Sequence, residues 1–150
     1  MSEKQSGSDE WADRTKVRDL FVHFVPELSE EVREEEDTNR SMRTRAVATN
    51  RGLGIVDGWF ESVPPTLEPM TVITMFVRGF LEPEIDGDRR DDALKRAGEF
   101  IGEILEIDGA RDAIDLEIVA YFEEVPGSWS AFEPYATPKF REYVKVFVFP

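Results

Sequence analysis

Side chains that could carry nucleophilic or acid–base chemistry are scarce in this chain. Its 150 residues include one histidine, His23, and no cysteine. Ser-His-Asp and Cys-His chemistry place an imidazole beside the nucleophile, and no G-x-S-x-G turn presents a serine here. His23 lies within the apolar segment 17–25, where a lone histidine is more often structural. The sequence therefore predicts no catalytic residue.

Two short motifs resemble ligand sites but are incomplete. The R-G-L-G sequence at 51–54 has the first spacing of a G-x-G-x-x-G loop, but Asp57 stands where the third glycine belongs. The D-G-D sequence at 86–88 gathers oxygen ligands, but its glycine is misplaced for a Ca²⁺ loop. These carboxylates suit the start of a helix, with Asp88 or Asp91 as its cap. We predict no cofactor, no metal site and no enzymatic activity.

A basic patch is the first candidate binding site. Arg40, Arg43 and Arg51 fall near one side of a predicted helix in an otherwise acidic chain. Such a patch suits a phosphate backbone, but it also suits the chain's own acidic run Glu30–Asp37 or an acidic neighbouring subunit. Contact with a protein is the favoured interpretation.

An aromatic loop is the second candidate. Residues 126–139 are predicted to form a long loop that holds Trp129, Phe132 and Tyr135. Loops of this length are often functional, and aromatic side chains anchor interfaces. We expect these rings to contact a partner, so that Trp129→Ala or Phe132→Ala weakens assembly. The alternative is that the rings fold back onto the core.

The charge balance points to the environment of the protein. The formal net charge is −14, and the basic residues are 13 arginines and five lysines. Few lysines and many carboxylates fit a protein from molar salt, where the Debye length falls to about 3 Å. This interpretation predicts that thermal stability rises with KCl. An ordinary acidic protein and an acidic mimic of DNA are the alternatives.

The apolar patterns predict an α+β fold: a small, mostly antiparallel sheet with two main helices packed against it. Residues 1–14 are expected to form a mobile arm, followed by one domain at 15–150. Segment 17–25 fits a helix or a strand. Gly98 and Gly102 are neighbours on a helix and would let another backbone approach. The predicted elements are helices near 37–62 and 91–107 and strands at 71–81, 115–124 and 140–149.

The order of these elements resembles that of the tail terminator, or tail completion, proteins of long-tailed viruses. The resemblance covers about residues 38–150, from the first helix through the strands at 71–81, 115–124 and 141–149. It implies a ring, usually a hexamer, in which sheet edges and long loops contact the neighbouring subunits. It carries over no functional residue.

These observations lead to one expected function and one alternative. The first is a structural virion protein of a tailed virus, from a halophilic host, forming an oligomeric ring at the neck/tail junction. Its partners would be copies of itself and neighbouring neck or tail proteins, with nucleic acid at most passing through the ring. No membrane partner is expected, because no apolar run approaches about 18–20 residues. The alternative is a cytoplasmic acidic regulator or inhibitor that binds another protein, including by mimicking DNA.

Overall fold

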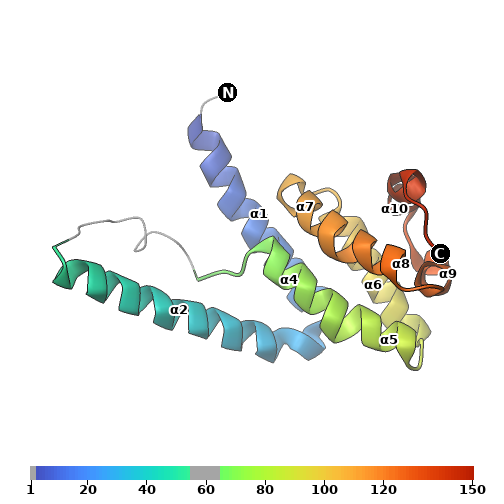
Figure 1. Ribbon diagram of the computed structural model, residues 1–150, viewed down its shortest axis with the longest axis horizontal. Coiled ribbons are helices and arrows are strands. Elements are labelled where there is room, and N and C mark those ends of the chain that lie inside the picture. Colours follow the sequence, from blue (N-terminus) through green and yellow to red (C-terminus); the bar gives the residue numbers. More distant parts are fainter. Residues whose placement is uncertain (1–2, 55–64) are drawn as a thin grey trace.

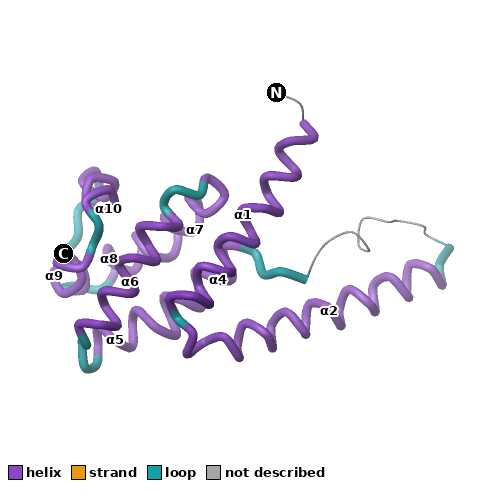
Figure 2. Tube along the Cα trace, turned by 180° about the vertical axis from the view of Figure 1, so that it is seen from behind, coloured by secondary structure: helices purple, strands orange, loops and turns teal. Residues whose placement is uncertain are grey.

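The structure is a computed structural model that describes residues 3–54 and 65–150. Helices joined by short turns make up most of this part of the chain, and none of its residues lies in a β-strand (Figure 2). The prediction of an α+β fold with a small sheet is therefore wrong. The described chain is all α.

Most of the helices pack into a body; one whole helix projects from it, and the N-terminal end of α1 also extends beyond it (Figure 1). The first part of the chain consists of α1 (Glu3–Phe24), the turn η1 (Pro26–Leu28) and α2 (Ser29–Gly52). A long helix then combines α4 (Pro69–Phe76), the π-helical η2 (Val77–Leu81) and α5 (Glu82–Asp86). It is followed by α6 (Asp91–Ile104), the turn η3 (Asp108–Ala110) and another long helix made of α7 (Arg111–Ala113), the π-helical η4 (Ile114–Val119) and α8 (Ala120–Glu124). The chain closes with α9 (Ser128–Phe132), η5 (Glu133–Tyr135), α10 (Pro138–Tyr143) and η6 (Val144–Val146).

Segment 71–81, predicted as a strand with two apolar faces, is helical. Its buried residues recur in adjacent pairs every four positions, which is one broad face of a helix. Pro69 stands in the first turn of α4, where its missing N–H costs nothing. The buried residues are Val72, Ile73, Phe76, Val77, Phe80 and Leu81.

Segment 115–124 is also helical. Ile114, Ile118 and Phe122 are fully buried at a spacing of four. Leu116, which a strand would have turned inward, is 64% exposed. The helical period therefore describes the burial and the alternating pattern does not.

The C-terminal segment is not a strand either. Residues 138–146 form α10 and η6, with Phe140 and Val144 buried one helical turn apart. The predicted loop at 126–139 contains α9 and η5. This C-terminal part of the chain covers one end of the body (Figure 1).

Segment 17–25 fitted a helix or a strand, and the structure shows a helix, because residues 17–24 form the end of α1. Val17, Phe21 and Val25 are fully buried at helical spacing. Residues 3–14 are the first half of the same helix, and their mobility stays a prediction. The carboxylate of Asp13 accepts a hydrogen bond of 3.1 Å from the Gly109 amide, so this half of α1 contacts the body.

Aromatic rings fill the centre of the body. Phe21, Phe76 and Phe100 come from α1, α4 and α6, and their ring centroids lie 4.7 to 6.5 Å apart. Edge and tilted contacts of this kind stabilise beyond the buried area alone. The predicted helix at 91–107 is confirmed as α6, which supplies the third of these rings.

Gly98 and Gly102 on α6 lie directly beneath another segment of the chain, as predicted. A Cβ built on Gly98 would lie 2.0 Å from the carbonyl oxygen of Tyr135. A Cβ on Gly102 would lie 2.7 Å from the Thr137 side chain. The missing side chains let the C-terminal segment cross directly over α6, so the prediction of a close backbone approach is confirmed.

Candidate interaction surface

Helix α2 is the projecting helix and is called the α2 arm below. It starts at Ser29, earlier than predicted, and includes the acidic stretch as a solvated helix. It ends at Gly52, well before the predicted end near residue 62, so the expectation of a single helix to that point is wrong; its glycines at 52 and 54 stand where it stops. Of its 24 residues, Val32 alone is buried. Figure 1 shows its C-terminal end pointing away from the other helices.

A bidentate ion pair fixes the turn where the α2 arm leaves the body. The Arg96 guanidinium of α6 donates to both carboxylate oxygens of Glu27 at 2.8 and 2.9 Å. It also donates to the carbonyl oxygen of Phe24 at 2.9 Å, at the end of α1. The guanidinium holds the pKa of the Glu27 carboxyl below its usual range. These contacts tie α6 to the end of α1 and to the turn itself.

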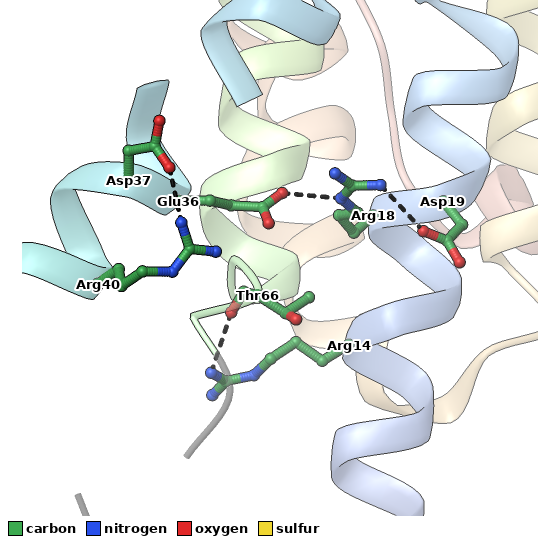
Figure 3. A network of polar contacts seen from close by, with 7 residues as sticks. All are labelled: Arg14, Arg18, Asp19, Glu36, Asp37, Arg40 and Thr66. Atoms are coloured by element: carbon green, nitrogen blue, oxygen red, sulfur yellow. Dashed lines mark hydrogen bonds and ion pairs between the residues drawn. The ribbon is translucent and has the colours of Figure 1, made fainter. Parts of the chain in front are cut away.

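A second ion pair holds the N-terminal part of the α2 arm against α1 (Figure 3). Arg18 donates through Nε to a carboxylate oxygen of Glu36 at 2.7 Å and through a terminal nitrogen to Asp19 at 3.2 Å. The Glu36 contact raises the pKa of the Arg18 guanidinium. The same view shows Arg14 of α1 reaching the Thr66 carbonyl, so α1 also contacts the segment that precedes α4.

Charge is divided sharply along the α2 arm. The acidic half, residues 29–37, holds six carboxylates and one arginine. The basic half, residues 38–52, holds four arginines and no acidic residue. Asp37 and Arg40 meet at the junction in an ion pair of 2.8 Å (Figure 3). A basic half of this length is unusual in a chain with net charge −14.

One face of the α2 arm is exposed along its whole length. Its side chains are spaced three and four residues apart, so they form a single line on the helix. Met42 stands near the middle and is 62% exposed. We call this line the outer stripe; its members are Glu31, Glu35, Thr38, Met42, Arg45 and Thr49.

The predicted arginines all lie on the basic half of the α2 arm. Arg40 and Arg51 are exposed and Arg43 is half-buried, and each of the three is engaged in contacts within the chain. Arg45 is close in sequence to the predicted patch but was not assigned to its face, and it is the arginine on the outer stripe. Its spacing of three from Met42 is the signal that would have placed it there.

The predicted aromatic residues lie on the body instead. Phe132 is fully buried and stacks on Phe122 at 5.2 Å between centroids. Trp129 is half-buried between Phe122 and Phe149, at 5.2 and 5.1 Å. The Tyr135 hydroxyl donates to the Asp91 carboxylate, which raises the pKa of Tyr135. For Phe132 and Trp129 the structure shows the alternative, in which the rings fold onto the core.

The start of α6 is held differently from the prediction. Arg90 occupies the cap position, and its side chain makes no cap hydrogen bond. The Glu84 carboxylate instead accepts from the backbone N–H of Arg90 at 3.1 Å and from its Nε at 2.6 Å. That contact lowers the pKa of the Glu84 carboxyl. The expectation that Asp88 or Asp91 caps this helix is wrong.

His23 is exposed on α1 and packs edge-on against Phe24. Within residues 3–54 and 65–150, no group of three or more acidic or histidine side chains is placed to hold a metal ion. None of the helices in that part of the chain has the length and hydropathy to cross a membrane.

Comparisons of the chain with protein-family models, with curated proteins and with solved structures found no match. The segments that carried the resemblance to tail terminator proteins, at 71–81, 115–124 and 141–149, contain no strand.

Proposed function

We propose that this protein is a non-enzymatic interaction protein that binds another protein chain through the α2 arm. The observation that carries the proposal is a 24-residue helix with one buried side chain that projects from a well-packed body. A helix that is polar on most of its surface gains little from packing on its own domain. Binding of a partner along its length would supply the missing contacts.

The division of charge favours a protein partner over nucleic acid. Phosphates would attract the arginines of the basic half, but they would be repelled by the six carboxylates of the adjacent acidic half. A protein surface with both signs of charge can match both halves. Such complementarity sets orientation and suppresses wrong partners.

This proposal covers both functions expected from the sequence. A virion subunit in a ring and a regulator that binds another protein would each use a projecting contact helix. The halophilic source, the ring at the neck/tail junction and the virion location stay predictions. A closed ring would be recognised by its molar mass in solution.

The experiment compares two exposed apolar positions of nearly equal accessibility. A photo-crosslinking amino acid replaces Met42 on the α2 arm, 62% exposed, or Leu116 on the body, 64% exposed. We expect irradiation to produce a discrete protein adduct from position 42 and none from position 116, in the purified protein or in an extract of the cells that make it. Absence of an adduct at position 42, or equal adducts at both positions, contradicts the proposal.

A further inference from the structure

We propose that the partner of the α2 arm is a second copy of this chain, bound antiparallel along the outer stripe. This inference rests on the proposed function and names its partner. The twofold axis passes between Thr38 and Met42, near the junction of the acidic and basic halves. Each subunit therefore supplies the same surface to the other.

The charges of the α2 arm are complementary to themselves in this orientation. Antiparallel pairing places residues 29–37 of one copy beside the basic half of the other. The symmetry creates this contact twice, once at each end of the interface. A parallel arrangement would instead place six carboxylates beside six carboxylates, so it is disfavoured.

The spacing of the outer stripe fixes the register. With the axis between Thr38 and Met42, Thr38 faces the partner's Met42. In the same register Glu35 faces the partner's Arg45, and Glu31 faces the partner's Thr49. All six stripe side chains are exposed in the isolated chain, so no rearrangement of the body is required.

The apolar contact lies at the centre of this interface. The two Met42 side chains flank the twofold axis, where they cover the short Thr38 side chains and each other. A flexible thioether fits such an irregular contact well. Glu35 and Arg45 lie on the same line as Met42, so their ion pairs with the partner close the interface on either side of this apolar centre.

The shape of the molecule also fits two copies. The body lies at the N-terminal end of the α2 arm (Figure 1), so antiparallel pairing places the two bodies at opposite ends of the interface. The arm is 24 residues long, about 36 Å at 1.5 Å per residue. This separation exceeds the Debye length of about 10 Å at 0.1 M salt, so repulsion between two chains of net charge −14 is largely screened.

Charge reversal with the full chain tests the proposal. In Glu35→Arg, the new arginine faces the partner's Arg45, and in Arg45→Glu two carboxylates face each other. Because each unfavourable contact occurs twice, we expect either variant alone to weaken dimerisation by at least about tenfold. In an equimolar mixture of the two variants every contact regains opposite charges. We therefore expect the mixture to form a heterodimer with affinity close to that of the wild type.

Sedimentation equilibrium at about 0.1 M salt gives the affinities, and circular dichroism shows that each variant keeps its helices. Glu99→Arg, at an exposed position on α6, is the control and should dimerise like the wild type. Molar KCl screens both the contacts and the repulsion between bodies, so salt dependence is not used as the criterion.

Three results would overturn the inference: a wild-type monomer at millimolar concentration, single variants that associate like the wild type, or a mixture that stays monomeric. If the wild type is monomeric and the crosslinker at position 42 captures a different protein, the partner proposed here is wrong while the proposed function stands. If position 42 yields no adduct and the wild type is monomeric, both fail.

Discussion

The body and the α2 arm use their side chains for different purposes. The body buries rings from several helices against one another, including Phe21, Phe100 and Phe122, each fully buried. The α2 arm buries Val32 and carries both signs of charge. The free energy of folding is therefore concentrated in the body, whereas the arm presents an exposed, charged outer stripe that can specify a partner.

The largest expected difference between the two regions comes from removing a large apolar side chain. Phe132→Ala leaves a cavity beside Phe122, so we expect the free energy of unfolding to fall by about 3–5 kcal/mol. Met42→Ala on the arm should change it by less than about 0.5 kcal/mol, because that side chain is mostly exposed. Urea unfolding of both variants measures the contrast. Equal values would show that Phe132 is not part of the core.

The glycines provide a second, smaller contrast. Gly98→Ala forces a Cβ against the Tyr135 carbonyl oxygen, 2.0 Å away, so the C-terminal segment must shift. We expect a loss of about 1–3 kcal/mol, the usual cost of overpacking, or more. Gly52→Ala meets no atom within 4 Å and should raise the helix content of the arm without lowering the midpoint of thermal unfolding. A thermal melt that is unchanged in Gly98→Ala would contradict the close crossing.

Alkaline pH should weaken the C-terminal part of the body. Burial, with a hydrogen bond to Asp115, raises the pKa of Tyr143 to about 12, and burial raises that of Tyr121 to about 12. The folded-state pKa lies above the ordinary value of about 10. The stability that each neutral hydroxyl contributes is therefore complete below about pH 10. It is lost as the pH rises through about 12.

Tyr143→Phe separates one of these two contributions. We expect it to cost about 1–2 kcal/mol at neutral pH through the lost hydrogen bond to the Asp115 carboxylate. Its stability should then fall less steeply than that of the wild type between pH 10 and 12, as measured by urea midpoints. Parallel pH profiles for the two proteins would contradict the assignment to Tyr143.

The smallest expected effect lies at the base of the arm. The Arg96 contact lowers the pKa of Glu27, so this pair stabilises the fold above the ordinary pKa of Glu, about 4.3. The contribution is lost as the pH falls through the lowered value. Because both side chains are partly exposed, Glu27→Gln should cost about 0.5–1 kcal/mol at pH 7 after allowance for solvent screening.

Amide hydrogen exchange in η1 and the first turn of α2 locates this effect. Faster exchange there, with unchanged exchange in α6, is the expected result for Glu27→Gln. Glu34→Gln, on an exposed carboxylate of the same arm beyond its first turn, is the control and should leave that exchange unchanged. Uniformly faster exchange throughout the body would mean that the pair supports the whole fold rather than the turn.

Long apolar patterns predicted the correct element, and short ones did not. The helix at 91–104 was predictable because its buried positions, from Ala93 to Ile104, repeat over several turns. Segments 71–81 and 115–124 were assigned as strands because runs of about ten residues fit either period. Continuous burial on neighbouring positions such as Val72 and Ile73 was attributed to a covered strand, but a helix surrounded by other helices buries the same pair.

The candidate site was predicted in part. The arginines of the basic half were identified from their place in an acidic chain, and all lie on the α2 arm. The aromatic residues were assigned to an interface because they stood in a predicted loop. In the structure that segment folds into α9 and η5, and its rings lie against Phe122. The residue types correctly indicated that these side chains make contacts. In the structure the contacts are with the core and not with another protein.

The sequence by itself determined the charge pattern of α2, the spacing of its outer stripe and the glycine pair that admits a crossing segment. These features depend on residues close together in the chain, whose positions a helix fixes. The tertiary structure alone decided that α2 leaves the body. That outcome depends on Arg96 meeting Glu27 and on the burial of rings from α1, α4 and α6, which are contacts between distant segments that no local pattern contains.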